Sequence, residues 1–87
     1  MFHLIGTWTE KAVASEDCLL PVPQGLAPET ASVLLNTAGI AYRLLNDFAK
    51  LESGDFIIQN AASSPVGLAI AQLAKARGIK TINVVCD

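Results

Sequence analysis

Two short apolar runs with a helical pattern between them occupy residues 56–85, FIIQNAASSPVGLAIAQLAKARGIKTINVV. The runs Phe56–Ile58 and Thr81–Val85 are β-prone, which predicts two strands that are covered on both faces. The residues Val66–Ala76 between them predict a helix, and Gly78 suits the left-handed position that commonly ends one. Strands that are joined through a helix run parallel, with a right-handed crossover. The chain is therefore predicted to contain a βαβ unit of an α/β fold.

The turn between the first strand and the helix consists of small residues, Asn60–Gly67 (NAASSPVG). In dinucleotide-binding folds this turn must reverse tightly, let the backbone approach phosphate and bring helix and strand close together. Gly67 is its only glycine, so the GxGxxG fingerprint is absent. Alanine and serine are nevertheless small, serine hydroxyls can donate to phosphate, and a helix N-terminus attracts anions. Pro65 removes one N–H donor, but its fixed φ suits the first residue of a helix.

Two interpretations of this turn fit the pattern. In the first, the turn binds a dinucleotide, and Asp87, about twenty residues after Gly67, stands where an acidic residue commonly contacts the adenosine ribose. In the second, residues 61–65 only connect a strand to a helix, and Ser63 caps the helix. Short motifs match by chance often enough that the pattern alone favours neither interpretation.

The segment at the start of the chain is predicted to be mainly extended. Thr7–Ala14 (TWTEKAVA) mixes β-prone residues in an irregular alternation and predicts a strand, which the turn residues 15–17 end. Leu19–Val22 is a second candidate strand, but Pro21 and Pro23 cannot donate to a sheet ladder. We therefore expect this second segment at a sheet edge or in an extended connection.

Two short helices are predicted before the βαβ unit. Pro28 and Glu29 are typical of a helix start, because proline lacks an N–H that would be unpaired there and a carboxylate suits the positive end of the helix dipole. Gly39 argues against one continuous helix, so we expect a joint near Asn36. In the second helix, four apolar residues recur at helical spacing and predict a buried stripe, namely Ile40, Leu44, Phe48 and Leu51.

The composition limits the classes of function. The 87 residues are 52% hydrophobic and 16% charged, with a formal net charge of −2. Such a short chain forms one small domain, and its charge argues against a nucleic-acid partner or an anionic membrane surface. No apolar run approaches about 18 residues, which argues against a transmembrane helix. Cys18 and Cys86 are interpreted as ordinary buried or half-buried thiols of a reducing compartment, because neither has metal-site spacing.

Five stretches of the chain, taken together, resemble one known family. They are GTW at 6–8, AYRLLNDF at 41–48, LESGD at 51–55, IIQN at 57–60 and TINVV at 81–85. In this order they resemble the mitochondrial trans-2-enoyl-CoA reductases, a quinone-oxidoreductase-like branch of the medium-chain dehydrogenase/reductase family. The resemblance covers nearly all of the chain after residue 5, and it favours the cofactor interpretation of the turn.

The resemblance implies an NADPH-dependent enzyme that reduces the double bond of 2-enoyl thioesters in mitochondrial fatty-acid synthesis, and a homodimer. It implies that residues 1–27 end a GroES-like β substrate domain. Residues 28–87 would then hold linking helices and the first βαβ unit of a Rossmann-like, doubly wound parallel sheet. No residue corresponds to the family's catalytic tyrosine, which Tyr42 does not match, and no metal ligand is implied. The positions that correspond to cofactor contacts of the family are Asn36, Ser63, Ser64, Pro65, Val66 and Asp87.

Three positions depart from the family pattern. Pro65 replaces a glycine, Thr37 replaces a proline, and Cys86 replaces an arginine that favours the 2′-phosphate of NADPH. The choice between NADPH and NADH is therefore left open. The chain is expected to be a fragment with little turnover of its own. Two alternatives stand beside this reading: a truncated, non-catalytic interaction module that pairs through exposed strand edges, and a fragment of a related quinone or alkene reductase.

Overall fold

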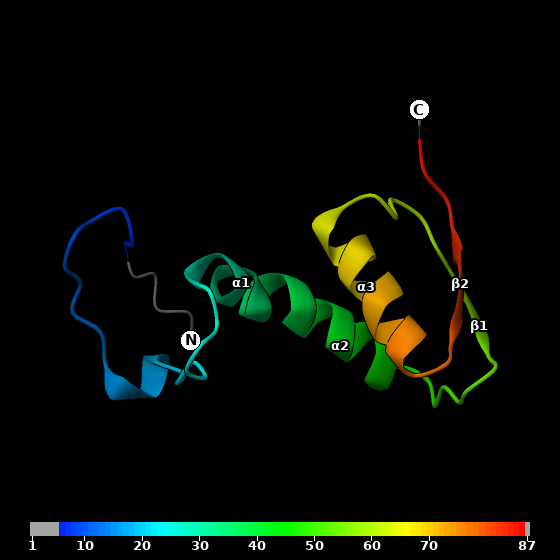
Figure 1. Cartoon of the computed structure of the whole chain (residues 1–87), viewed down its shortest axis with the longest axis horizontal. Helices are drawn as coiled ribbons and strands as arrows, with labels where there is room; N and C mark the ends of the chain where they lie inside the picture. The colour runs from blue at the N-terminus through cyan, green and yellow to red at the C-terminus, as the bar shows by residue number, and fades with distance from the viewer. Residues whose placement is uncertain (1–5, 87) are drawn as a thin grey trace.

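A parallel βαβ unit closes the chain, as the sequence predicts (Figure 1). The computed structural model describes residues 6–86. In it, β1 (Phe56–Gln59) and β2 (Lys80–Asn83) form a two-stranded parallel sheet in which the two strands pair residue for residue. α3 (Pro65–Ala76) connects them, and Gly78 follows it with a φ of +72°. The predicted α/β class, the parallel pairing and the left-handed stop are confirmed.

The helices that precede the sheet are joined through a π-helical segment. α1 (Pro28–Val33) has proline at its first position, as predicted, and leads directly into the π-helical residues Leu34–Ala38. α2 (Gly39–Asn46) follows. The expected joint near Asn36 is confirmed, because Asn36 lies inside the π-helical segment. Such segments are rare and occur frequently at functional sites.

α2 buries a different stripe from the one predicted. The predicted residues are largely exposed, with Ile40 at 48%, Leu44 at 46% and Phe48 at 80%. Their neighbours Ala41 and Leu45 are buried instead, at 0% and 3%. The helix ends at Asn46, so its last predicted stripe positions do not lie on it. The prediction is wrong for these three residues, whereas Leu51 is half-buried against the cluster. The helical period extends past the true end of the helix, and it does not say which face of α2 meets α3.

Close packing of α2 against α3 explains which face of α2 is buried. α2 contacts α3, and Ala41 on α2 is fully buried. Ala41, Leu45 and Ile70 form the buried cluster, around which partly buried apolar residues pack, namely Leu51, Ile57, Val66, Ala69 and Leu73. Each large apolar side chain that is fully buried contributes about 1.5–3 kcal/mol, so this small cluster holds the helices to the sheet.

Residues 6–86 cover one face of the sheet and leave the other open. Side chains alternate along β1, so that Ile57 and Gln59 are half-buried on the side of α3, whereas Phe56 and Ile58 are exposed on the other side. The prediction of strands covered on both faces is therefore wrong for the described chain. β2 also ends earlier than predicted, at Asn83.

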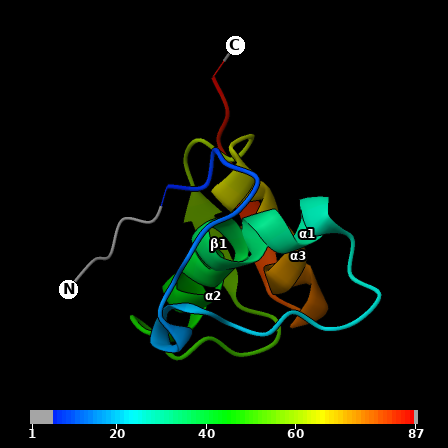
Figure 2. The ribbon, with the colours of Figure 1, turned by 90° about the vertical axis from the view of Figure 1, so that its left-hand side faces the viewer.

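Residues 6–27 contain no strand. The strand predicted at Thr7–Ala14 is wrong: these residues are bends and coil, and Trp8 is fully exposed because no strand of the described chain lies beside it to pair with. A 3₁₀ turn, Glu16–Cys18, follows, and Leu19–Val22 is an extended connection, the alternative that its prolines allowed. Figures 1 and 2 show this segment looping beside α1, away from the sheet. The radius of gyration is accordingly 15.9 Å, against about 12 Å for a compact chain of this length.

Candidate functional site

The turn between β1 and α3 is tied to the carboxyl ends of both strands. The Ala62 N–H donates to the Val84 carbonyl at 3.2 Å, and the Val84 N–H donates to the Gln59 carbonyl at 2.9 Å. Inside the turn, the Ser64 N–H donates to the Ala61 carbonyl at 3.0 Å. Ala61 has a φ of +49°, a left-handed conformation that costs an L-residue about 1–2 kcal/mol. The hydrogen bonds around it hold the turn in this shape.

Gly67 stands where the turn touches the first helical turn of α3. A Cβ atom on Gly67 would lie 2.6 Å from the Ala62 carbonyl oxygen and 2.8 Å from the Ala61 carbonyl oxygen. Real Cβ atoms essentially never come so close to other atoms, so only glycine fits at this approach. Close contact between helix and strand is one of the roles of glycine in dinucleotide-binding turns. The single glycine of the turn is thus the one that its packing requires.

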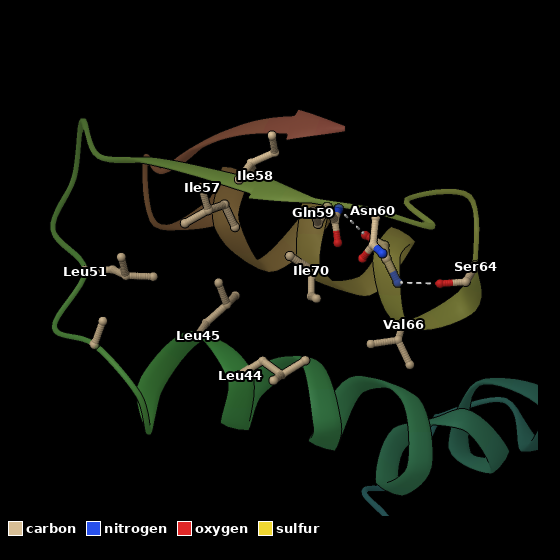
Figure 3. Close-up of a pocket in the computed structure, with 12 residues that line it drawn as sticks. Leu44, Leu45, Leu51, Ile57, Ile58, Gln59, Asn60, Ser64, Val66 and Ile70 are labelled. Atoms are coloured by element: carbon tan, nitrogen blue, oxygen red, sulfur yellow. Dashed lines mark hydrogen bonds between the residues drawn. The ribbon is translucent and has the colours of Figure 1, made fainter. Parts of the chain in front are cut away.

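Ser64 caps α3. It has an extended backbone, with φ −69° and ψ 159°, and its Oγ accepts a hydrogen bond from the Gly67 N–H at 3.2 Å (Figure 3). Pro65 follows as the first helical residue. The prediction that Ser63 is the cap is wrong. Pro65 is the first helical residue, and the cap is the residue directly before it, Ser64. Ser63 is exposed.

At the start of α3, the backbone N–H groups of Ser63 and Val66 donate to no other residue among those the structure describes. The next N–H groups are used, because Gly67 donates to Ser64 Oγ and Leu68 donates to the Ser64 carbonyl at 2.9 Å. Both unused donors lie at the N-terminus of a twelve-residue helix, the positive end of its dipole. Ser63 adds an exposed hydroxyl. This set of donors matches what a phosphate group needs.

A groove of about 450 Å³ runs from the turn along β1 toward α2 (Figure 3). Its end next to α2 is apolar and includes Leu45 and Ile57, and its end next to the turn is polar and includes Gln59, Asn60 and Ser64. The groove therefore reaches the strand end at which ligands bind in open α/β sheets.

The six predicted cofactor residues do not all lie in one place. Ser63, Ser64, Pro65 and Val66 lie together at the start of α3. Asn36 is exposed in the π-helical segment, which contacts α3. Asp87 lies outside the described residues.

Sequence reasoning missed Gln59. Its Nε2 donates to the Gly67 carbonyl at 3.0 Å and to Asn83 Oδ1 at 2.8 Å. The sequence carried a signal for this pair, because Gln59 directly follows the apolar run Phe56–Ile58 and Asn83 is the polar residue that interrupts the run Thr81–Val85. Parallel pairing brings them side by side at the carboxyl edge of the sheet.

The charged side chains with defined partners lie away from the turn. Arg77, after α3, donates to the Leu45 carbonyl at 3.4 Å and to Asn46 Oδ1 at 3.2 Å, and so ties the end of α3 to the end of α2. On α2, a hydrogen bond to Asp47 and the charge of that carboxylate raise the pKa of Arg43. These contacts stabilise the scaffold.

Cys18 and Cys86 are both exposed free thiols, so the expectation that they are buried or half-buried is wrong. Cys18 lies in the 3₁₀ turn and Cys86 lies after the end of β2, so neither belongs to the buried cluster. Within residues 6–86 no three His, Cys, Asp or Glu side chains gather where they could hold a metal ion. The same residues include no helix with the length and apolarity that crossing a membrane requires.

Comparison with curated proteins finds relatives named mitochondrial enoyl-[acyl-carrier-protein] reductase. The chain is 55% identical over 82 residues to the protein named mitochondrial enoyl-[acyl-carrier-protein] reductase in Dictyostelium discoideum, covering 94% of this chain and 23% of that relative. The proteins of the same name from Homo sapiens and Arabidopsis thaliana are 47% and 39% identical, over 95% and 94% of this chain and 22% of each relative. No protein-family model matches the chain. The predicted resemblance to mitochondrial enoyl thioester reductases is confirmed over the matched residues.

The chain spans less than a quarter of the length of these relatives. The match includes β1, the turn and α3, so the candidate site lies within the shared stretch.

Proposed function

We propose that residues 28–87 form the linking helices and the first βαβ unit of the nucleotide-binding domain of a mitochondrial enoyl thioester reductase. The identity of 55% with the Dictyostelium relative over 82 residues carries this assignment. The geometry supports the nucleotide part, because the N-terminus of α3 lies at the carboxyl ends of two parallel strands. Residues 1–27 are, in this proposal, the end of a GroES-like β domain.

The proposed cofactor is NADPH, with its diphosphate at the start of α3. The N–H groups of Ser63 and Val66 and the hydroxyl of Ser63 donate to phosphate oxygens. The hydroxyl of Ser64 accepts from Gly67 and keeps its own hydrogen for a further bond. Pro65 donates nothing and fixes the direction of the helix start.

Asn36 and Asp87 complete the proposed set of cofactor contacts. When bound, NADPH supplies the hydride that reduces the alkene of a 2-enoyl thioester. The residues of this chain bind and orient it. With no counterpart of the family's catalytic tyrosine, we propose that this stretch has little turnover of its own and works as part of a homodimeric reductase in mitochondria.

A second candidate function is a non-catalytic interaction module. The open face of the sheet carries four exposed apolar side chains, Phe56, Ile58, Ile82 and Val84. Exposed apolar faces and strand edges favour pairing with other chains.

A related quinone or alkene reductase would share the fold and the hydride chemistry. The names of the relatives favour the enoyl thioester, and a substrate screen on a complete enzyme separates the two.

The cofactor proposal is tested by titrating the purified chain with NADPH and NADH and following nicotinamide fluorescence. We expect saturable enhancement, and the ratio of the two affinities gives the preference left open by Cys86. No response to either nucleotide would reduce the turn to a simple connection.

The variant Ser63→Asp separates binding from folding. A carboxylate at a helix N-terminus stabilises the helix by about 0.3–1 kcal/mol, but it repels a diphosphate. We therefore expect a loss of affinity of about tenfold or more with no loss of stability. Gln72→Glu, on the exposed part of α3, adds the same charge away from the turn and controls for net charge. Equal affinity of the two variants would contradict the proposed position of the diphosphate.

A monomer that unfolds cooperatively at micromolar concentration in analytical ultracentrifugation and denaturation would count against the interaction module.

A further inference from the structure

We infer that Gln59 is a positioning residue of the proposed nucleotide site, which holds the start of α3 at a fixed distance from the end of β2. The inference rests on the proposed function. Gln59 lies at the end of β1 and its side chain turns toward α3 (Figure 3). Its Nε2 donates to the Gly67 carbonyl at 3.0 Å and to Asn83 Oδ1 at 2.8 Å.

Both hydrogens of the Gln59 amide nitrogen are used, one toward the helix and one toward the neighbouring strand. The amide of Asn83 is oriented in turn, because its Nδ2 donates to Thr81 Oγ1 at 3.3 Å. The result is a chain of hydrogen bonds that starts on β2, crosses the end of β1 and finishes on the backbone of α3. Its members support one another's orientation.

The contact with Gly67 links Gln59 to the proposed phosphate donors. The Gly67 N–H donates to Ser64 Oγ, and the Gly67 carbonyl accepts from Gln59. A displacement of Gly67 would therefore move the capped turn that presents the N–H groups of Ser63 and Val66.

This arrangement matters most for a ligand that spans both strand ends. The diphosphate is proposed to lie at the start of α3, and the adenosine ribose beyond the end of β2. A fixed spacing between these two places lowers the ordering cost of a ligand that contacts both. A ligand that contacts only the turn gains little from it. Gln59 is thus expected to favour nucleoside diphosphates over inorganic pyrophosphate.

The test compares Gln59→Met with Gln72→Met. Methionine has nearly the length of glutamine and no N–H donor, and Gln72 is exposed on the same helix that Gln59 contacts. The affinities of the full chain for ADP and for inorganic pyrophosphate are measured by ¹⁵N–¹H NMR on the Gly67 amide. We expect Gln59→Met to weaken ADP binding about tenfold, because the spacing of the two strand ends must then be ordered on binding, and pyrophosphate binding less than about twofold. Gln72→Met should change neither.

Two results would overturn the inference. The first is ADP affinity as high in Gln59→Met as in Gln72→Met. The second is an equal loss of affinity for ADP and for pyrophosphate together with a lowered unfolding midpoint, which would show a role in folding alone. If the wild-type chain binds neither ADP nor pyrophosphate, the proposed function fails, and hydrogen exchange of the Leu68 amide then tests the positioning separately. Faster exchange in Gln59→Met than in Gln72→Met supports it, and equal exchange refutes it.

Discussion

Replacing Gly67 with alanine tests the close approach of α3 to the turn. The added Cβ would lie 2.6 Å from the Ala62 carbonyl oxygen, where ordinary contact begins at 3.4 Å. The atoms that it meets belong to the backbone and cannot rotate away, so the helix start must move by about 0.8 Å, an overpacking that costs about 1–3 kcal/mol. Alanine returns about 1 kcal/mol of helix propensity. Because the clash is with backbone atoms, we expect the upper part of the overpacking range, about 2–3 kcal/mol, and therefore a net loss of about 1–2 kcal/mol in the free energy of unfolding.

The matched control is Gly39→Ala at the start of α2. Gly39 has a helical φ of −62°, and a Cβ there would find its nearest atom, the Leu34 carbonyl oxygen, at 3.4 Å. Without a clash, alanine should stabilise the chain by about 0.5–1 kcal/mol. Urea unfolding followed by far-UV circular dichroism measures both variants. The two substitutions are chemically identical and are expected to act with opposite sign.

The reasoning would be refuted if Gly67→Ala unfolded at the same urea concentration as the wild type or at a higher one. A Cβ atom on residue 67 would then lie further than 2.6 Å from the Ala62 carbonyl oxygen, and α3 would lie further from the turn. A nucleotide titration adds a second readout, because moving the Gly67 carbonyl also breaks its contact with Gln59.

Three further substitutions test the turn and the scaffold by the same unfolding assay. Ser64→Ala removes the cap of α3 and should cost about 1 kcal/mol, whereas Ser63→Ala should stay within about 0.5 kcal/mol; equal effects would contradict the cap assignment. Ala61→Gly relieves a left-handed alanine and should stabilise by about 0.5–1 kcal/mol, and destabilisation would show that φ is not positive there. Arg77→Met removes the tie between the ends of α3 and α2 and should cost about 1 kcal/mol, against less than about 0.5 kcal/mol for Lys75→Met; no difference would show that the arginine contacts contribute nothing.

Local signals were sufficient for the elements of the βαβ unit. The start of α1 at Pro28 and the end of α3 at Gly78 follow from the backbone preferences of proline and glycine, which act within a few residues. The order strand, helix, strand predicts a parallel pair, because the helix returns the chain to the end of the sheet at which the first strand began. The predicted cofactor residues 63–66 are adjacent in the chain, so no long-range contact was needed to group them.

Other features depend on neighbours that no local pattern specifies. The strand predicted at Thr7–Ala14 failed because β structure needs a partner strand, and none lies beside it in the described chain. The buried face of α2 depends on where α3 meets it, and there Ala41 and Leu45 of α2 form a cluster with Ile70 of α3. The cap is Ser64 and not the predicted Ser63. Adjacent serines are equally suitable caps by residue type, and the backbone angles at the helix start decide between them.

The sequence by itself determined a parallel βαβ unit, the position of its turn and the resemblance to enoyl thioester reductases, because periodicity, glycine, proline and short motifs act locally. Only the tertiary structure decided that Gly67 is required by a backbone contact, that the N–H groups of Ser63 and Val66 have no partner among the described residues, and that Gln59 reaches both α3 and β2. These properties depend on distances between atoms that lie up to 24 positions apart in the chain. Such distances are set when helices and strands pack, and one sequence read in order does not contain them.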